Sequence, residues 1–175
     1  VSVIFADGAG AVVVSRTEEN KGIRSTHLHS EGKYAKELFI QSPSSKNNPR
    51  VSDKLIEEKT FNLQMNGQEV FKHAIKRFPE VIEEALDENG LTVEDIDLII
   101  PHQANHRITN FIRKKMNIDE DKIVSNIHKY GNTTAASVPI ALAESVYSKR
   151  INKGDTIILA AFGSGFSWGS ALIKW

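Results

Sequence analysis

Two polar side chains stand at matching places in the sequence, each between a short apolar run and a helical pattern. Residues 97–100 form an apolar run that predicts a buried strand, and His102 comes shortly after it. Residues 122–126 predict a second strand, and Asn132 separates it from a helical pattern over residues 135–147. Ligands of open α/β sheets bind outside the carboxyl ends of the strands. We therefore expect His102 and Asn132 to face one crevice.

A histidine and an asparagine at such an edge can stabilise negative charge that develops on a carbonyl oxygen. Both side chains carry N–H donors, and the amide stays neutral across the working pH range. Each residue also has a plainer interpretation. His102 can be a loop histidine with an ordinary hydrogen bond, and Asn132 can be a turn residue in the Tyr-Gly-Asn-Thr segment at 130–133. The residues alone leave both alternatives open.

The histidine spacing does not predict a metal site. A zinc peptidase would have His-Glu-x-x-His on one helix. Here Gln103 follows His102, and His102 precedes the helix that is predicted to begin at about Asn105. His27 and His29 share a predicted strand face with no third ligand nearby, so a solvated face is expected. The chain has no cysteine, which excludes disulfides, thiolate metal sites and a cysteine nucleophile within it. We expect no metal and no cofactor.

Two Gly-x-Gly turns, at residues 8–10 and 163–165, lie in matching surroundings. Each stands between two apolar runs, and neither is followed by the Lys-Ser/Thr of a phosphate loop, so nucleotide binding is not expected. The turns are 155 residues apart, which indicates a duplicated half-molecule rather than a short repeat. This predicts that the chain is a piece of a longer protein.

The composition excludes several broad classes of function. With 22 basic and 22 acidic residues, the formal net charge is zero, which gives no overall attraction to nucleic acid or to an anionic membrane. The apolar runs are far shorter than the ~20 residues of a membrane span, and the first residues have no signal-peptide pattern. The length of 175 residues suits one domain with a real core.

The remaining expected elements place the two polar residues in an α/β layer structure. In chain order they are a hairpin (1–6 with 9–14), a strand (22–31), a long polar surface loop (32–53), an amphipathic helix that begins after Gly67 and is stopped by Asn89-Gly90, a Thr-x-x-Asp capping box (92–95) and a third strand (156–161). Pro79 lies inside the long helix and is expected to kink or break it.

Five motifs occur together in one order. They are Asp-Gly-Ala-Gly-Ala at 7–11, Met-Asn-Gly-Gln-Glu-Val-Phe-Lys at 65–72, Pro-His-Gln-Ala-Asn at 101–105, Tyr-Gly-Asn-Thr-Thr-Ala-Ala-Ser-Val-Pro at 130–139 and Phe-Gly-Ser-Gly-Phe-Ser-Trp-Gly at 162–169. With these motifs, nearly the whole chain closely resembles the carboxyl-terminal half of β-ketoacyl-acyl-carrier-protein synthase III, a family of thiolase-like condensing enzymes.

The resemblance implies the fold and its division. The chain would be the carboxyl-terminal half of a thiolase-like α/β fold, a mixed sheet with helices on both faces, within a five-layered αβαβα subunit that dimerises. Residues 1–16 would be the closing hairpin of the amino-terminal half. Residues 17–60 would be a connecting region with a long polar loop, and residues 61–175 the carboxyl-terminal half itself.

The resemblance also implies a reaction. The family starts fatty-acid synthesis by condensing an acyl-CoA primer with malonyl-acyl-carrier protein, using a Cys–His–Asn triad. The motifs match His102 and Asn132 to the His and Asn, which would donate hydrogen bonds to the malonyl thioester oxygen as CO₂ leaves. The Cys belongs to the amino-terminal half, so this chain alone is expected to be inactive in acyl transfer. The implied partners are acyl carrier protein, coenzyme A thioesters, the amino-terminal half and a second copy, in the cytoplasm.

Further site residues follow only from the resemblance. The pantetheine arm would contact Gly67, Ala104 and Asn105. The carrier protein would dock on Lys72, Arg107, Lys114 and Lys115, in agreement with the basic faces of the two predicted helices that carry them. The turn beside the nucleophile would be Phe162, Gly163, Ser164 and Gly165, which can supply a backbone N–H to the acyl oxyanion. Ser164 departs from the family, in which many members have a third glycine.

Two other functions stay open. The first is a related acyltransferase of specialised metabolism on the same fold, which would use the same His–Asn pair but a different acyl pocket. The second is a non-catalytic module that binds carrier protein or coenzyme A. Such a module would bind without decarboxylating its ligand.

Overall fold

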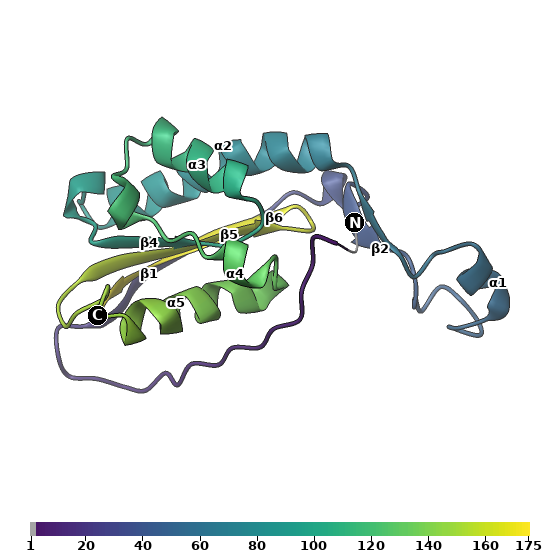
Figure 1. The fold of residues 1–175 in the computed structure, drawn as a ribbon, viewed down its shortest axis with the longest axis horizontal. Coiled ribbons are helices and arrows are strands. Elements are labelled where there is room, and N and C mark those ends of the chain that lie inside the picture. Colours follow the sequence, from purple (N-terminus) through teal and green to yellow (C-terminus); the bar gives the residue numbers. More distant parts are fainter. Residues whose placement is uncertain (1–2) are drawn as a thin grey trace.

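Helices cover both faces of a mixed sheet in the computed structural model, which describes residues 3–175 (Figure 1). In chain order the elements, with 3-10 helices marked η, are β1 (Gly22–Ser30), η1 (Gly32–Tyr34), β2 (Leu38–Ile40), α1 (Asp53–Glu57), β3 (Leu63–Met65), α2 (Gly67–Glu88), η2 (Val93–Asp95), β4 (Leu98–Pro101), α3 (His106–Lys115), η3 (Glu120–Lys122), α4 (Ile127–Tyr130), η4 (Thr134–Ala136), α5 (Ser137–Tyr147), β5 (Thr156–Gly163) and β6 (Ser167–Lys174). Helices α2 and α3 lie on one face of the sheet and α5 lies on the other.

The main sheet has the strand order β1-β6-β5-β4. Strands β4 and β5 are parallel, whereas β6 runs antiparallel to both of its neighbours. Strands β2 and β3 form a separate antiparallel pair. Because β4 and β5 run in the same direction, their carboxyl ends lie at one edge of the sheet. This edge is where the sequence predicts the site.

Strand β4 is apolar at every position because the sheet is covered on both faces. Leu98 and Ile100 pack with Ala141 and Leu142 of α5, whereas Ile99 packs in the cluster that contains α2 and α3. Successive side chains of a strand point to opposite faces, so a strand buried on both faces reads as a continuous apolar run. The sequence therefore identifies this strand even though it is only four residues long.

Of the kink or break expected at Pro79, the break does not occur, because helix α2 continues through this residue. A proline removes a single intrahelical N–H, and here the neighbouring side chains hold the helix on the sheet. Phe78 and Ile82, at 1% and 0% exposed, belong to the core cluster beneath it. The helix ends at Glu88 with Asn89 as its C-cap, in agreement with the stop predicted at Asn89-Gly90, and Gly90 adopts a left-handed conformation with φ +63°. Of the helices within residues 3–175, none has the length and apolarity that crossing a bilayer requires.

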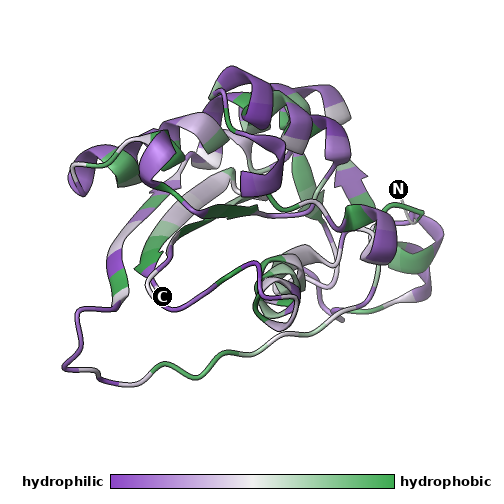
Figure 2. Ribbon diagram, turned by 60° about the vertical axis from the view of Figure 1, so that its left-hand side comes forward, coloured by the Kyte–Doolittle hydropathy of each residue, from purple (hydrophilic) through white to green (hydrophobic). Residues whose placement is uncertain are grey.

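The predicted hairpin at the start of the chain is not formed in residues 3–14, and its residues 1–2 lie outside the described residues. Instead, this segment passes along the start of α5, where Gly8 and Gly10 approach Thr133 and Pro139 so closely that a Cβ would clash. Its apolar part runs apart from the sheet (Figure 2), and Val13 is 97% exposed. An isolated two-stranded hairpin is only marginally stable without a surface to pack on.

The second predicted strand, residues 122–126, is also not formed. Ile123 makes an isolated parallel bridge with Ile99, and the Val124 N–H donates to the Ile99 carbonyl at 2.9 Å. The chain then turns at once into α4, so no longer ladder develops. The predicted polar loop over residues 32–53 is interrupted by η1 and β2. A strand of three residues, such as β2, is too short to show an alternating pattern in the sequence.

Candidate functional site

His102 directly follows β4 at the carboxyl edge of the sheet. Its backbone N–H donates to the Ala160 carbonyl of β5 at 2.8 Å, so the sheet itself positions the residue. Strand β4 includes Pro101, one residue beyond the predicted end. A proline fits at this position because β4 is an edge strand of the sheet. The hydrogen bond to the Ala160 carbonyl is donated by His102, so Pro101 does not need an N–H for it.

A hydrogen bond to Ser137 holds the His102 ring. Its Nδ1 lies 2.5 Å from the hydroxyl oxygen of Ser137, the first residue of α5. Burial lowers the pKa of His102 from its ordinary value of 6.5 to about 4, because the charged imidazolium would lose its hydration. The ring is therefore neutral at neutral pH, with a proton on only one nitrogen.

We expect the His102 ring to make the protein less stable as the pH falls from 6.5 to about 4. In this range the unfolded chain takes up a proton at His102 and the folded chain does not, so the free energy of unfolding decreases. Above pH 6.5 neither state is protonated there, and the contribution is constant. Urea unfolding at a series of pH values, in wild type and His102→Gln, measures the effect as the difference between two curves. Parallel curves would show that the pKa is not lowered.

Asn132 is 6% exposed and follows α4. Its backbone carbonyl accepts a hydrogen bond from the Ala6 N–H at 2.9 Å, and its side-chain Oδ1 accepts one from the Thr134 N–H at 2.9 Å. Since the Thr134 N–H can only donate, the amide oxygen must face it. The Asn132 NH₂ is then the end that remains available to a ligand.

One short segment orients both side chains. Asn132 is held by Thr134, His102 is held by Ser137, and both holding residues belong to the turn that opens α5. Within residues 3–175, no protein group bonds to the Asn132 Nδ2 or to the His102 Nε2. The arrangement can therefore present two neutral hydrogen-bond groups at one edge of the sheet.

The turn between β5 and β6 lies at the same edge. Phe162 is buried, and β5 continues to Gly163, two residues beyond its predicted end. The Ser164 hydroxyl donates to the Leu38 carbonyl of β2 at 2.5 Å, so the serine ties the turn to the β2–β3 pair. Gly165 has φ +136°, and a Cβ there would lie 2.5 Å from the Ser167 hydroxyl oxygen, so only glycine fits.

The three residues expected to hold a pantetheine arm occupy two helix starts. Ala104 and Asn105 form the turn between His102 and α3, in which Asn105 accepts a hydrogen bond from the Arg107 N–H at 2.9 Å. Gly67 is the first residue of α2, with open space where a Cβ would stand. The first turns of α2 lie beside the β5–β6 turn, because the rings of His73 and Phe166 are 5.2 Å apart.

The four basic residues expected to dock a carrier protein do not gather in one place. Lys72 and Arg107 are exposed in the first turns of α2 and α3, at the edge that carries His102. Lys114 and Lys115 are exposed in the last turn of α3, roughly 10 Å further along that helix. The structure thus brings Lys72 and Arg107 to the site edge and leaves the other two at the far end of α3.

No structural or catalytic role was predicted for Gln103 from the sequence, yet its side chain organises the backbone behind the site. It is 2% exposed, and its side-chain NH₂ donates to the carbonyls of Pro101 and Val124 at 2.8 and 3.1 Å. Its amide oxygen accepts from the Asn126 N–H at 3.0 Å. Gln103 therefore joins the end of β4 to the segment that leads to Asn132. Nothing in its sequence position signals this, because Val124 and Asn126, the two partners outside the end of β4, are 21 and 23 residues away.

Glu144 of α5 is a second residue that the sequence did not single out. Its carboxylate accepts hydrogen bonds from Asn126, Lys129 and Tyr130 at 2.7, 2.7 and 3.0 Å. These bonds, that from Asn126 above all, lower the pKa of Glu144. The charged carboxylate thereby holds α4 against α5, just before Asn132.

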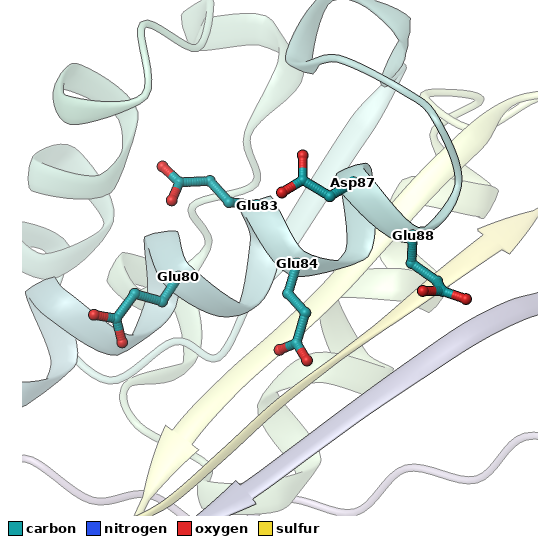
Figure 3. Close-up of a pocket in the computed structure, with 5 residues that line it drawn as sticks. All are labelled: Glu80, Glu83, Glu84, Asp87 and Glu88. Atoms are coloured by element: carbon teal, nitrogen blue, oxygen red, sulfur yellow. The ribbon is translucent and has the colours of Figure 1, made fainter.

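A surface hollow on the second half of α2 is lined only by acidic residues (Figure 3). They are Glu80, Glu83, Glu84, Asp87 and Glu88. His29 Nε2 and His27 Nδ1 of β1 lie 2.6 and 3.3 Å from the Glu84 carboxylate, and the bond from His29 lowers the Glu84 pKa. The two histidines are therefore paired rather than freely solvated. This half of α2 is the end away from the β5–β6 turn, so the hollow is separate from the site edge.

Family models match both ends of the chain. The model described as 3-Oxoacyl-[acyl-carrier-protein (ACP)] synthase III C terminal matches residues 86–175, which include His102, Asn132 and the β5–β6 turn. The model described as 3-Oxoacyl-[acyl-carrier-protein (ACP)] synthase III matches residues 1–32.

Curated relatives and solved structures agree with these matches. The chain is 43% identical to a beta-ketoacyl-[acyl-carrier-protein] synthase III of Rhodospirillum centenum and 45% identical to one of Clostridium perfringens, over 99% and 98% of its length. It spans only 52% of each relative. The synthase III structure from Thermus thermophilus superimposes with a TM-score of 0.82 at 38% identity, over 93% of this chain and 49% of that one. The Aquifex aeolicus structure gives 0.79 at 36% identity, over 92% and 47%. The predicted half of a thiolase-like α/β fold is confirmed.

Proposed function

Because the chain belongs to the 3-oxoacyl-[acyl-carrier-protein] synthase III family, we propose that it is the decarboxylating half of such a condensing enzyme. The complete enzyme would join an acyl-CoA primer to malonyl-acyl-carrier protein and so initiate fatty-acid synthesis in the cytoplasm. One observation carries the proposal. Asn132 is bound at its amide oxygen and His102 at its Nδ1, and the Asn132 NH₂ and the His102 Nε2 have no hydrogen-bond partner among residues 3–175.

The two residues would act on the malonyl thioester. When the bond to the carboxylate breaks, CO₂ leaves and its electron pair stays on the substrate as an enolate, whose negative charge is on the former thioester oxygen. Donors on His102 and Asn132 would stabilise that oxygen more strongly in the transition state than in the ground state. The enolate carbon then attacks the acyl thioester on the cysteine, and the thiolate leaves. A neutral His102 fits this role, because no proton has to be transferred to the oxygen.

The cysteine would come from outside these 175 residues, which contain none. The chain spans about half the length of the relatives it matches, so the upstream half of a full synthase would supply the nucleophile. In that enzyme, residues 1–16 would close the amino-terminal half, 17–60 would connect the halves and 61–175 would form the carboxyl-terminal half of a five-layered, dimeric subunit. The exposed run at Val12, Val13 and Val14 supports this division, because it would then have a sheet to join.

Substrate binding would use the rest of the site edge. Gly67, Ala104 and Asn105 would contact the pantetheine arm of the malonyl thioester, and the β5–β6 turn would offer a backbone N–H to the acyl thioester oxygen. The acidic carrier protein would dock first on Lys72 and Arg107, with Lys114 and Lys115 at the periphery. Opposite charges on two surfaces mainly accelerate association and select the partner.

We expect Arg107→Glu to raise KM for malonyl-acyl-carrier protein about tenfold, with kcat nearly unchanged, because a reversed charge at the docking face opposes association. The effect should shrink as the salt concentration rises. Lys153→Glu is the matched control, since Lys153 is exposed in the turn before β5, at the other end of the sheet. Equal effects of the two substitutions would argue against a docking role for Arg107.

The intact mass of the polypeptide that the natural gene encodes tests the proposal. A mass roughly twice that of this chain is expected. Incubation with acyl-CoA should acylate one cysteine upstream of this chain and raise the mass of the polypeptide by that of the acyl group. A product of the size of this chain, which binds carrier protein without releasing CO₂, would favour the non-catalytic module instead. An acyl-enzyme whose primer is unrelated to fatty-acid synthesis would favour a specialised acyltransferase.

A further inference from the structure

The Ser137 hydroxyl has two polar neighbours and one proton to give. Its oxygen lies 2.5 Å from His102 Nδ1 and accepts a hydrogen bond from the Gln103 N–H at 3.2 Å. Ser137 is 2% exposed, so water cannot accept a hydrogen bond from its hydroxyl. Among the neighbours of this hydroxyl in residues 3–175, His102 Nδ1 is the only one that can accept, because the Gln103 N–H is a donor.

We infer that Ser137 is a positioning residue that donates its hydroxyl proton to His102 Nδ1 and so keeps the ring proton on Nε2. The opposite tautomer would place a second donor against the same hydroxyl and leave the buried O–H without a partner. Leaving a buried donor unpaired is more costly than the gain from an ordinary hydrogen bond. The Gln103 N–H, already on one lone pair of the oxygen, helps to orient the hydroxyl proton towards the ring.

This inference deepens the proposed function and rests on it, because His102 can stabilise an enolate oxygen only if the nitrogen facing the substrate carries the proton. A neutral imidazole has two tautomers, and the hydrogen bond made by one nitrogen decides which form is present. Ser137 would thus have the same effect on His102 that the Thr134 N–H has on Asn132. In both cases a group of the α5 start occupies the acceptor and leaves the donor for the ligand.

Nitrogen NMR of the full natural polypeptide tests the tautomer without any assay of catalysis. With ¹⁵N-labelled histidine, and the His102 signals assigned by their loss in His102→Gln, we expect Nε2 to carry the proton and Nδ1 to resonate as an unprotonated nitrogen. In Ser137→Ala the Nδ1-protonated form should become populated. A wild-type ring protonated at Nδ1, or a tautomer that Ser137→Ala leaves unchanged, would overturn the inference.

Kinetics separate positioning from folding. We expect Ser137→Ala to lower kcat for decarboxylation of malonyl-acyl-carrier protein about tenfold, with KM within about twofold, since one neutral hydrogen bond is lost and the substrate contacts remain. Ser137→Thr keeps the hydroxyl and should recover most of the rate. Ser145→Ala is the matched control, because Ser145 is also 2% exposed in α5 but its hydroxyl donates only to the Ala141 carbonyl. Equal losses in Ser137→Ala and Ser145→Ala would overturn the positioning role.

The two measurements distinguish failure of the inference from failure of the proposed function. If the wild-type ring has the Nε2 proton but His102→Ala decarboxylates normally, Ser137 still sets the tautomer and the function assigned to His102 is wrong. If His102→Ala is inactive but the wild-type ring has the Nδ1 proton, the function stands and the role of Ser137 is wrong.

Discussion

Replacing His102 by alanine in the full synthase is expected to lower the rate of malonyl-thioester decarboxylation by about 10²- to 10³-fold, the usual loss when one oxyanion donor is removed. Transfer of the acyl group from coenzyme A to the cysteine should continue, because that step does not need the malonyl oxygen. Release of labelled CO₂ from malonyl-acyl-carrier protein measures the first step, and labelling of the protein by acyl-CoA measures the second.

His128→Ala is the control for this experiment. His128 is also a histidine near the site, in α4, but it is exposed, and we place it in neither the catalytic nor the binding machinery. Both rates should be unchanged in that variant. Equal loss of acyl transfer and decarboxylation in His102→Ala would contradict the assignment, because it would show a general structural defect rather than a missing donor.

Replacing Gln103 by alanine is expected to lower the free energy of unfolding by about 3 kcal/mol or more. The change leaves two buried carbonyls and one buried N–H without partners and also opens a cavity. Urea unfolding measures the loss. Gln41→Ala, on an exposed residue, should change stability by no more than about 0.5 kcal/mol.

A second substitution at Gln103 separates the hydrogen bonds from the volume. Methionine has nearly the same size and lacks the amide, so Gln103→Met removes the three bonds without a large cavity. We expect this variant to be nearly as destabilised as the alanine variant. Wild-type stability in Gln103→Met would show that the buried amide contributes little to holding the segment before Asn132.

The sequence predicted those parts of the fold whose signal is local. The apolar run of β4 reveals a strand that is buried on both faces, and the spacing of apolar residues reveals α2. The positions of His102 and Asn132 follow from the same reasoning, because each comes just before a helix that the pattern identifies. Motif order then predicted the family, which the comparisons confirmed.

Features that depend on distant partners were missed or mistaken. Residues 122–126 have a strand-like composition, but they meet β4 in an isolated bridge at Ile123 rather than in a ladder, because α4 begins immediately afterwards. The expected break at Pro79 is absent because core packing outweighs the loss of one helix hydrogen bond. The hydrogen bond between the Gln103 N–H and the Ser137 hydroxyl joins residues that are 34 positions apart, and no spacing rule predicts such a contact.

A crystal structure of the natural polypeptide with a malonyl-pantetheine analogue, in which an amide replaces the thioester, tests the central claim most directly. We predict that the carbonyl oxygen of the analogue lies about 2.7–3.1 Å from both His102 Nε2 and Asn132 Nδ2, as expected for donors aimed at a developing oxyanion. The pantetheine arm should pass Gly67, Ala104 and Asn105. An analogue that binds with its carbonyl oxygen away from both nitrogens would contradict the proposed role of the pair.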